Sequence, residues 1–107
     1  LDPEDAEAWL NKGIALADQG KDDEAIQAYD EAIRLDPELI WAWFCKGLTL
    51  MMQDKYDEAI LAFDETIGLD PGFADAWYFR GFAFETLGRT TEANEAYTKA
   101  EELGFAR

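Results

Sequence analysis

The sequence predicts an all-α protein built from three tandem pairs of helices. The tripeptide Leu-Asp-Pro occurs at 1–3, 35–37 and 69–71, so each copy follows the previous one after 34 residues. Aromatic and small residues recur at the same interval. The aligned triplets are Trp9, Trp43 and Trp77; Gly13, Gly47 and Gly81; Leu16, Leu50 and Phe84; Ala25, Ala59 and Ala93; Tyr29, Phe63 and Tyr97; and Ala32, Thr66 and Ala100. Residues 6–107 therefore divide into three units, 6–39, 40–73 and 74–107.

Each unit is expected to form two helices. In the first unit, Trp9 and Gly13 lie on one helical stripe that ends at the turn 19–21, and Ala25 and Tyr29 mark a second helix at helical spacing. Pro37 stops that helix because proline cannot continue the backbone hydrogen-bond ladder. Applied to all three units, the pattern predicts helices over 6–19, 22–35, 40–53, 56–69, 74–87 and 90–103.

The small residues have a packing role in this prediction. Gly13 and Ala25 allow two antiparallel helices to approach closely, and the neighbouring aromatic rings fill the space beside them. We therefore expect the three aligned tryptophans to be wedges in the core and not ligand contacts.

These residues resemble the tetratricopeptide repeat (TPR) family, whose 34-residue unit carries Trp, Gly, Leu or Phe, Ala, Tyr or Phe, Ala and Pro in this order. The resemblance covers residues 6–107. It implies helix pairs stacked into a right-handed superhelical solenoid, with a concave inner face that binds peptides and protein segments. The departures are Lys12, Lys46 and Arg80 where the family often has leucine, Thr66 in place of alanine, and Phe105 in place of the last proline.

The two ends of the repeated region differ. Residues 1–5 look like the remnant of a preceding repeat, because they begin with Leu-Asp-Pro. The second helices of the first two units carry isoleucines where a following repeat would pack, namely Ile26, Ile33, Ile60 and Ile67. Asn94 and Glu101 take these positions in the third unit, as expected for a terminal repeat whose outer face meets water. We therefore expect the array to end near Arg107.

Composition excludes several classes of function. Nine Lys plus Arg against 24 Asp plus Glu give a net charge of −15, which repels phosphate backbones and anionic lipids. No apolar run approaches the ~20 residues that span a bilayer. One cysteine and no histidine rule out an intrachain disulfide and imidazole chemistry. We expect a cytoplasmic chain without cofactor or metal that binds neither nucleic acid nor membrane.

The candidate catalytic residues have simpler structural interpretations. Asp22, Asp23, Glu24, Asp57 and Glu58 fall at the starts of second helices, where carboxylates favour the positive end of the helix dipole. Cys45 lies in an apolar helix and is interpreted as a small hydrophobic residue and not as a nucleophile. We therefore predict no enzymatic activity.

The predicted binding groove is the face of the first helices opposite the Trp/Gly/Leu stripe. Its apolar residues are Leu10, Ile14, Trp41, Phe44, Leu48, Met51, Met52, Tyr78 and Phe82. Its acidic rim consists of Glu7, Asp18, Asp75 and Glu85. A large apolar patch of this kind is typical of an interface. The alternative is that neighbouring first helices cover these side chains, in which case Phe44 belongs to the core.

The leading functional hypothesis is a scaffold that binds an apolar segment of another protein, preferably with Lys or Arg beside its anchors. The alternative is a self-association module that binds a second copy through the groove or the N-terminal end. Relatives that bind chaperone tails use a clamp of Lys, Asn, Asn, Lys and Arg. The residues at those positions here are Leu10, Ile14, Cys45, Asp75 and Phe79, and none matches.

Overall fold

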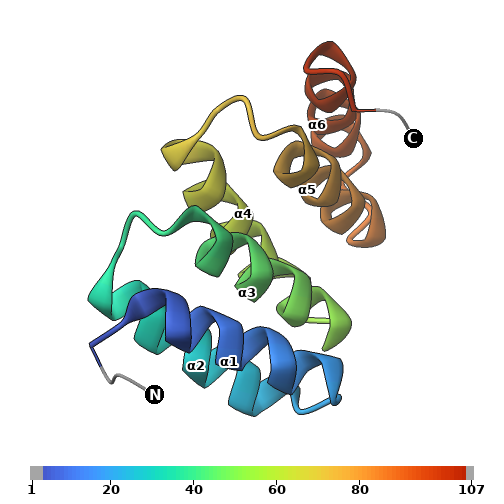
Figure 1. Cartoon of the computed structure of the whole chain (residues 1–107). Coiled ribbons are helices and arrows are strands. Elements are labelled where there is room, and N and C mark those ends of the chain that lie inside the picture. The colour runs from blue at the N-terminus through green and yellow to red at the C-terminus, as the bar shows by residue number, and fades with distance from the viewer. Residues whose placement is uncertain (1–3, 106–107) are drawn as a thin grey trace.

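The computed structural model describes residues 4–105 and contains six helices and no strand within that range (Figure 1). The helices are α1 (Ala6–Asp18), α2 (Asp22–Leu35), α3 (Ile40–Met52), α4 (Tyr56–Leu69), α5 (Ala74–Thr86) and α6 (Thr90–Glu102). Every helix begins at the predicted residue, and none ends more than one residue early. The all-α repeat fold is therefore confirmed.

The three helix pairs follow one another along an elongated molecule of 43 × 25 × 20 Å. Within each pair the two helices pack side by side, and the second helix also packs against the first helix of the next pair. The first helices α1, α3 and α5 contact each other in turn. This stacking makes the fold a solenoid with one row of first helices and one row of second helices (Figure 1).

Local sequence signals set the ends of the helices. The Asp5 side chain accepts a hydrogen bond from the Ala8 backbone N–H at 3.2 Å and caps α1. The turns inside the three pairs have left-handed backbone at Gly20, Asp54 and Gly88, with φ of 77°, 60° and 79°. The predicted carboxylates lie in the first turns of α2 and α4, as the dipole argument requires.

The predicted close approach within each pair is confirmed. A Cβ atom on Gly13 would lie 2.5 Å from Tyr29 Cε1 and 3.2 Å from the Ala25 carbonyl oxygen. Gly81 has the same relation to Tyr97, at 2.8 Å from Cδ1. The glycines therefore leave the space that the aromatic rings of the second helices occupy.

The three tryptophans are half-buried and not fully enclosed. The indole N–H of Trp43 donates to the Pro37 carbonyl oxygen at 3.0 Å, and that of Trp77 donates to the Pro71 carbonyl oxygen at 2.9 Å. Each of these tryptophans therefore ties the start of its first helix to the preceding loop. The three tryptophans are therefore only partly buried, whereas the sequence pattern predicts core residues.

The outer face of α6 is polar, as predicted. Asn94 and Glu101 are exposed, whereas Ile60 is buried and Ile26, Ile33 and Ile67 are half-buried. The predicted repeat remnant at residues 1–5 lies partly outside the described residues. Arg107, near which the array is predicted to end, lies outside them.

Candidate functional site

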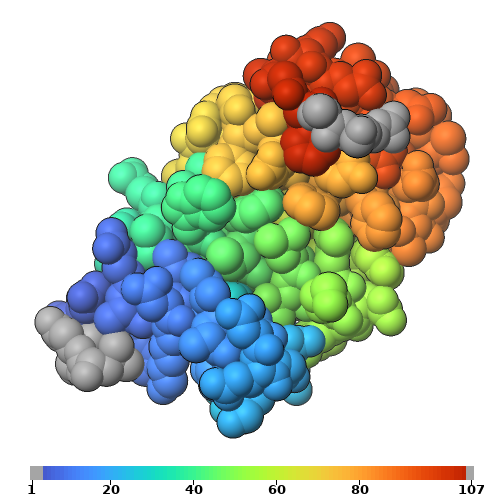
Figure 2. All heavy atoms as spheres, turned by 45° about the vertical axis from the view of Figure 1, so that its right-hand side comes forward, coloured from blue at the N-terminus to red at the C-terminus, as the bar shows by residue number. Residues whose placement is uncertain are grey.

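One face of the molecule carries the atoms of α1, α3 and α5 in succession, from blue through green to orange in Figure 2. This is the face that the sequence predicts to be concave. Its floor is set by α3, which lies between the other two first helices.

A hollow of about 500 Å³ lies between the C-terminal half of α1 and α3. Apolar side chains dominate its lining, and Asp18 and Asp22 stand at one end beside Gly20. The lining residues are Ile14, Ala17, Asp18, Gly20, Asp22, Tyr29, Cys45, Leu48, Thr49, Met51, Met52 and Phe79.

A second hollow of about 480 Å³ lies between the end of α3 and α5. Its lining residues are Met51, Met52, Asp54, Tyr56, Tyr78, Phe79 and Phe82. Met51, Met52 and Phe79 line both hollows, so the two hollows are neighbours across α1, α3 and α5. We call these two hollows together the groove.

Six of the nine predicted apolar residues line the groove. They are Ile14, Leu48, Met51, Met52, Tyr78 and Phe82. Met52 is the most open of the exposed large apolar residues, with 77% of its surface accessible. Trp41 is 50% exposed but lies outside both hollows, with its ring 5.2 Å from the ring of Phe73.

Leu10 and Phe44 belong to the core, which corrects their assignment to the surface of the groove. Leu10 is 8% exposed and Phe44 is 5% exposed. The Phe44 ring is covered by Phe73, with centroids 5.0 Å apart, and by Phe79, with centroids 6.0 Å apart. The alternative that neighbouring elements cover this side chain is therefore correct for Phe44.

The acidic rim is only partly at the groove. Asp18 lines the first hollow, whereas Glu7, Asp75 and Glu85 are exposed outside both hollows. Asp22 and Asp54 line the hollows and were not among the predicted rim residues. Both lie at the turns inside helix pairs, whereas the predicted rim consists only of residues of the first helices.

Phe79 is a large apolar residue that the prediction of the groove missed. It lies under both hollows and stacks on Phe63, with ring centroids 6.3 Å apart. Its position in the repeat corresponds to Asn11 and Cys45, neither of which is large. An aromatic residue at a position that is small or polar in the other two repeats is the signal that identifies it.

Cys45 and Tyr56, which line the groove, are among the groups whose neutral forms are favoured. Burial raises the pKa of the Cys45 thiol, which keeps it protonated and unreactive. The Tyr56 hydroxyl donates to Asp54 Oδ1 at 3.1 Å, and this hydrogen bond raises the Tyr56 pKa. Within residues 4–105, no group of three or more Cys, Asp or Glu side chains is placed to hold a metal ion.

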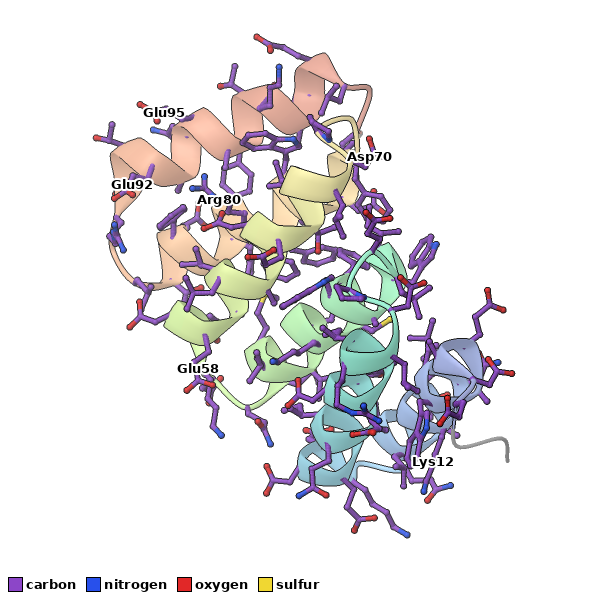
Figure 3. All side chains as sticks on the ribbon, turned by 90° about the vertical axis from the view of Figure 1, so that its left-hand side faces the viewer. Lys12, Glu58, Asp70, Arg80, Glu92 and Glu95 are labelled. Atoms are coloured by element: carbon purple, nitrogen blue, oxygen red, sulfur yellow. The ribbon has the colours of Figure 1, made fainter. Side chains whose placement is uncertain are left out.

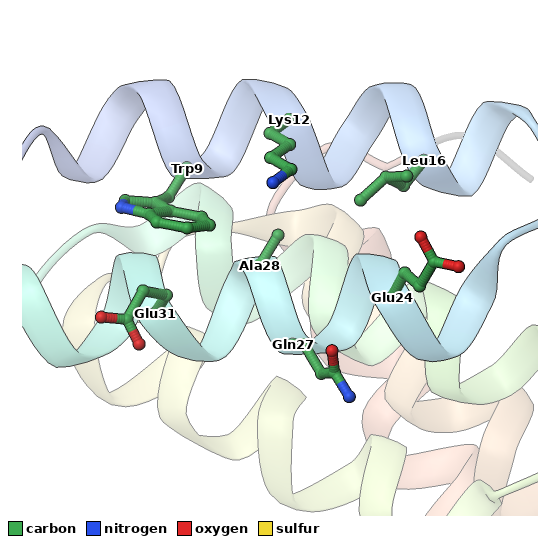
Figure 4. A pocket seen from close by; sticks show the side chains of 7 residues that line it. All are labelled: Trp9, Lys12, Leu16, Glu24, Gln27, Ala28 and Glu31. Carbon is green, nitrogen blue, oxygen red and sulfur yellow. The ribbon is translucent and has the colours of Figure 1, made fainter. Parts of the chain in front are cut away.

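A separate cleft of about 390 Å³ lies between α1 and α2, on the opposite side of α1 from the groove. Figure 4 shows Trp9, Lys12 and Leu16 projecting from α1 towards Glu24, Ala28 and Glu31 of α2. The equivalent residues of the second pair form a similar cleft of about 400 Å³. This cleft is therefore a feature of the repeat and not of one position.

The family follows from profiles that match most of the described chain. A profile described as "TPR repeat" matches residues 13–54, and one described as "Tetratricopeptide repeat" matches residues 46–104. The chain belongs to the tetratricopeptide repeat family.

Solved TPR structures have the same arrangement of helices. A crystal structure of MamA superposes with a TM-score of 0.94 at 34% identity, over 96% of this chain and 60% of the MamA chain. The first TPR domain of Spaghetti, bound to the HSP90 peptide SRMEEVD, superposes with a TM-score of 0.91 at 26% identity. The match covers 97% of this chain and 82% of the Spaghetti chain. The second TPR domain of Spaghetti, bound to the same peptide, superposes with a TM-score of 0.90 at 24% identity. The match covers 95% of this chain and 94% of that domain's chain.

The present chain thus spans about 60% of the MamA chain that it matches. None of the curated proteins matches the sequence. Among the described helices, none has the length and the apolar composition needed to cross a membrane.

Proposed function

We propose that this TPR chain is a non-catalytic scaffold that binds an apolar segment of another protein in its groove. The observation that carries the proposal is the pair of neighbouring apolar hollows that share Met51, Met52 and Phe79 in their linings. Flexible methionines beside aromatic rings adapt to apolar anchors of different shapes. Each large anchor that becomes buried contributes about 1.5–3 kcal/mol.

The charge of the groove favours a partner with Lys or Arg beside its anchors. Asp18 and Asp22 stand at one end of the first hollow, Asp54 lines the second, and the whole chain carries −15. Exposed charges of this kind contribute mainly to the association rate and to specificity. The affinity should therefore fall only modestly when the salt concentration is raised.

The TPR domains of Spaghetti were solved with a peptide, which supports a peptide as the class of ligand. The sequence of that peptide does not carry over, because none of the five clamp positions in the present chain holds a matching side chain.

Synthetic peptides with two leucine or phenylalanine anchors test the proposal. One set carries lysines beside the anchors, and a matched set carries glutamates. We expect the lysine set to bind and to shift the amide NMR signals of α1, α3 and α5. Binding should weaken for Met52→Ala and Phe82→Ala but not for Leu61→Ala, which removes a 66% exposed side chain from α4. Equal binding of both sets, or equal loss in all three variants, would contradict the proposal.

Self-association through the groove is the competing function, and light scattering across concentrations separates the two. A monomer at high concentration excludes it. A dimer that is lost on Met52→Ala would replace the scaffold proposal.

A further inference from the structure

The second hollow of the groove combines aromatic rings with a carboxylate. Of its seven lining residues, four are aromatic, two are methionines, and the seventh is Asp54. Among the described residues that line it there is no Lys or Arg. All seven lie between residues 51 and 82, away from both ends of the described chain.

Two of the four rings are open to a ligand. Phe82 on α5 is 39% exposed, and Tyr56 at the start of α4 is half-buried. Neither ring forms an aromatic pair or a cation–π contact within residues 4–105. Tyr78 and Phe79, by contrast, pack against each other with ring centroids 5.3 Å apart. Phe82 and Tyr56 are therefore the rings on which a bound group can stack.

Asp54 takes a backbone conformation that favours glycine. Its φ is 60°, and within residues 4–105 it is the only residue other than glycine with a positive φ. The equivalent turns of the other two helix pairs have Gly20 and Gly88. This conformation costs an aspartate energy that a glycine avoids, and such strain is often found at functional sites. The turn itself does not require the Asp54 carboxylate.

A neighbouring side chain orients this carboxylate. The Tyr56 hydroxyl donates to Asp54 Oδ1 at 3.1 Å, which leaves Oδ2 to accept hydrogen bonds from a ligand. Lys55 lies between these residues in the sequence, but it is exposed and does not line the hollow. A carboxylate and two open rings thus line the same hollow.

The molecule itself contains a cation held by a ring and a carboxylate. Arg80 Nε lies 2.6 Å from Asp64 Oδ1, and the guanidinium carbon lies 4.7 Å from the centroid of the Phe84 ring. Figure 3 shows this arginine among packed helices. A planar guanidinium can stack on a ring and donate to a carboxylate, whereas the lysine ammonium is a strongly hydrated point charge. The combination of ring and carboxylate therefore favours arginine over lysine.

We propose that the second hollow binds an arginine side chain of the partner segment. The guanidinium stacks against the open rings of Phe82 and Tyr56 and pairs with the Asp54 carboxylate. This inference rests on the proposed function, because the arginine belongs to the segment whose apolar anchors enter the groove.

The arginine comes from a different protein and not from a second copy of this chain. Within residues 4–105, Arg34, Arg80 and Arg89 each form an ion pair with a carboxylate of their own chain. A second copy would have to break one of these ion pairs before it could supply a guanidinium.

Three peptides that differ in one side chain test the inference. They carry the same two apolar anchors and either arginine, lysine or citrulline, which is the neutral isostere of arginine. Calorimetry should show that the arginine peptide binds about tenfold more tightly than the citrulline peptide, with lysine between them. Equal affinities for arginine and citrulline would overturn the inference.

The Asp54→Asn variant locates the effect. Asparagine also accepts left-handed backbone, so the variant should remain folded, which thermal melts check. The arginine and citrulline peptides should then bind with nearly equal affinity. Asp18→Asn, in the first hollow, is the matched control and should keep the preference for arginine. A preference that Asp54→Asn leaves unchanged would place the arginine elsewhere and overturn the inference.

Blocked single amino acids separate this inference from the proposed function. N-acetyl-argininamide carries no apolar anchor, so its binding does not depend on one. At millimolar concentration it should shift the amide NMR signals of Asp54, Tyr56 and Phe82, and N-acetyl-citrullinamide should not. If only the blocked arginine binds, the scaffold proposal fails and the arginine site stands. If the anchored peptides bind without a preference for arginine, the scaffold proposal stands and the arginine site fails.

Discussion

Gly47 lies directly against the ring of Phe63: a Cβ atom at Gly47 would come within 2.5 Å of Phe63 Cε1. Phe63 is fully buried, so its ring has no free space into which to move. The distance between α3 and α4 therefore depends on the absence of a side chain at this one position.

Gly47→Ala should destabilise the chain by about 1–3 kcal/mol, because the added methyl group forces the Phe63 ring or the helices apart. Gly68→Ala is the matched control, since Gly68 lies in α4 with no neighbouring atom within 4 Å. That change should stabilise the helix by up to about 1 kcal/mol. Urea denaturation measures both, and a neutral Gly47→Ala would contradict the close-approach argument.

Phe44→Ala should cost about 3–5 kcal/mol, because it removes a buried ring and leaves a cavity among Phe63, Phe73 and Phe79. Met52→Ala is the control, since Met52 is open to solvent and should change the melting temperature little. Thermal melts compare the two variants. A small loss of stability for Phe44→Ala would mean that Phe44 lies at the groove surface and not in the core.

Asp54→Gly should stabilise the chain by up to about 1 kcal/mol, because left-handed backbone costs an L-residue energy that glycine does not pay. Gly20 and Gly88 occupy the equivalent turns with similar φ. The Gly20→Asp variant should be less stable than the unmodified chain by a comparable free energy of unfolding. A less stable Asp54→Gly variant would mean that the hydrogen bond from Tyr56 outweighs the backbone strain.

Stability should fall in alkali because of Tyr29. Burial is the main cause that raises the pKa of this tyrosine to about 12, from an ordinary value of 10.0. Since the folded pKa lies above the unfolded one, the full stability is present below pH 10. The free energy of unfolding falls by roughly 2–3 kcal/mol as the pH rises from about 10 to about 12.

Tyr29→Phe tests this pH dependence. Phe63 stands at the same place in the second repeat, so phenylalanine fits the site. Denaturation at pH 8 and pH 11 should show a smaller difference for the variant than for the unmodified chain. If the stability difference between pH 8 and pH 11 is equal in the two proteins, groups other than Tyr29 cause the loss of stability in alkali.

The HSP90 peptide SRMEEVD should not bind. Of the five clamp positions Leu10 is buried, Ile14, Cys45 and Phe79 carry no cation, and the exposed Asp75 repels the peptide's carboxylates. Calorimetry should detect no heat of binding, with the first TPR domain of Spaghetti as the positive control. Micromolar binding that is lost on Asp75→Ala would contradict this interpretation.

The fold could be predicted from the sequence because its determinants are local and repeated. Gly13, Tyr29 and Pro37 recur with a 34-residue period, and each helix boundary follows from residues within one repeat. The groove could be predicted only in part, because helical spacing gives the direction of a side chain and not the distance to what it faces. Phe44 points as predicted, but Phe73 from the loop before α5 folds over it. That loop repeats the Leu-Asp-Pro sequence of residues 35–37, but the repeat does not show which side chain Phe73 contacts.

Each helix of the described chain packs only against its neighbours in sequence or against the next first helix. Contacts of such short sequence separation favour rapid folding, since little loop-closure entropy is lost before they form. They also make cooperativity weakest at the two ends, where a helix pair has a neighbour on one side only. Amide hydrogen exchange should therefore be slowest in α3 and α4 and faster towards α1 and α6, with the outer pairs opening while the middle pair remains folded.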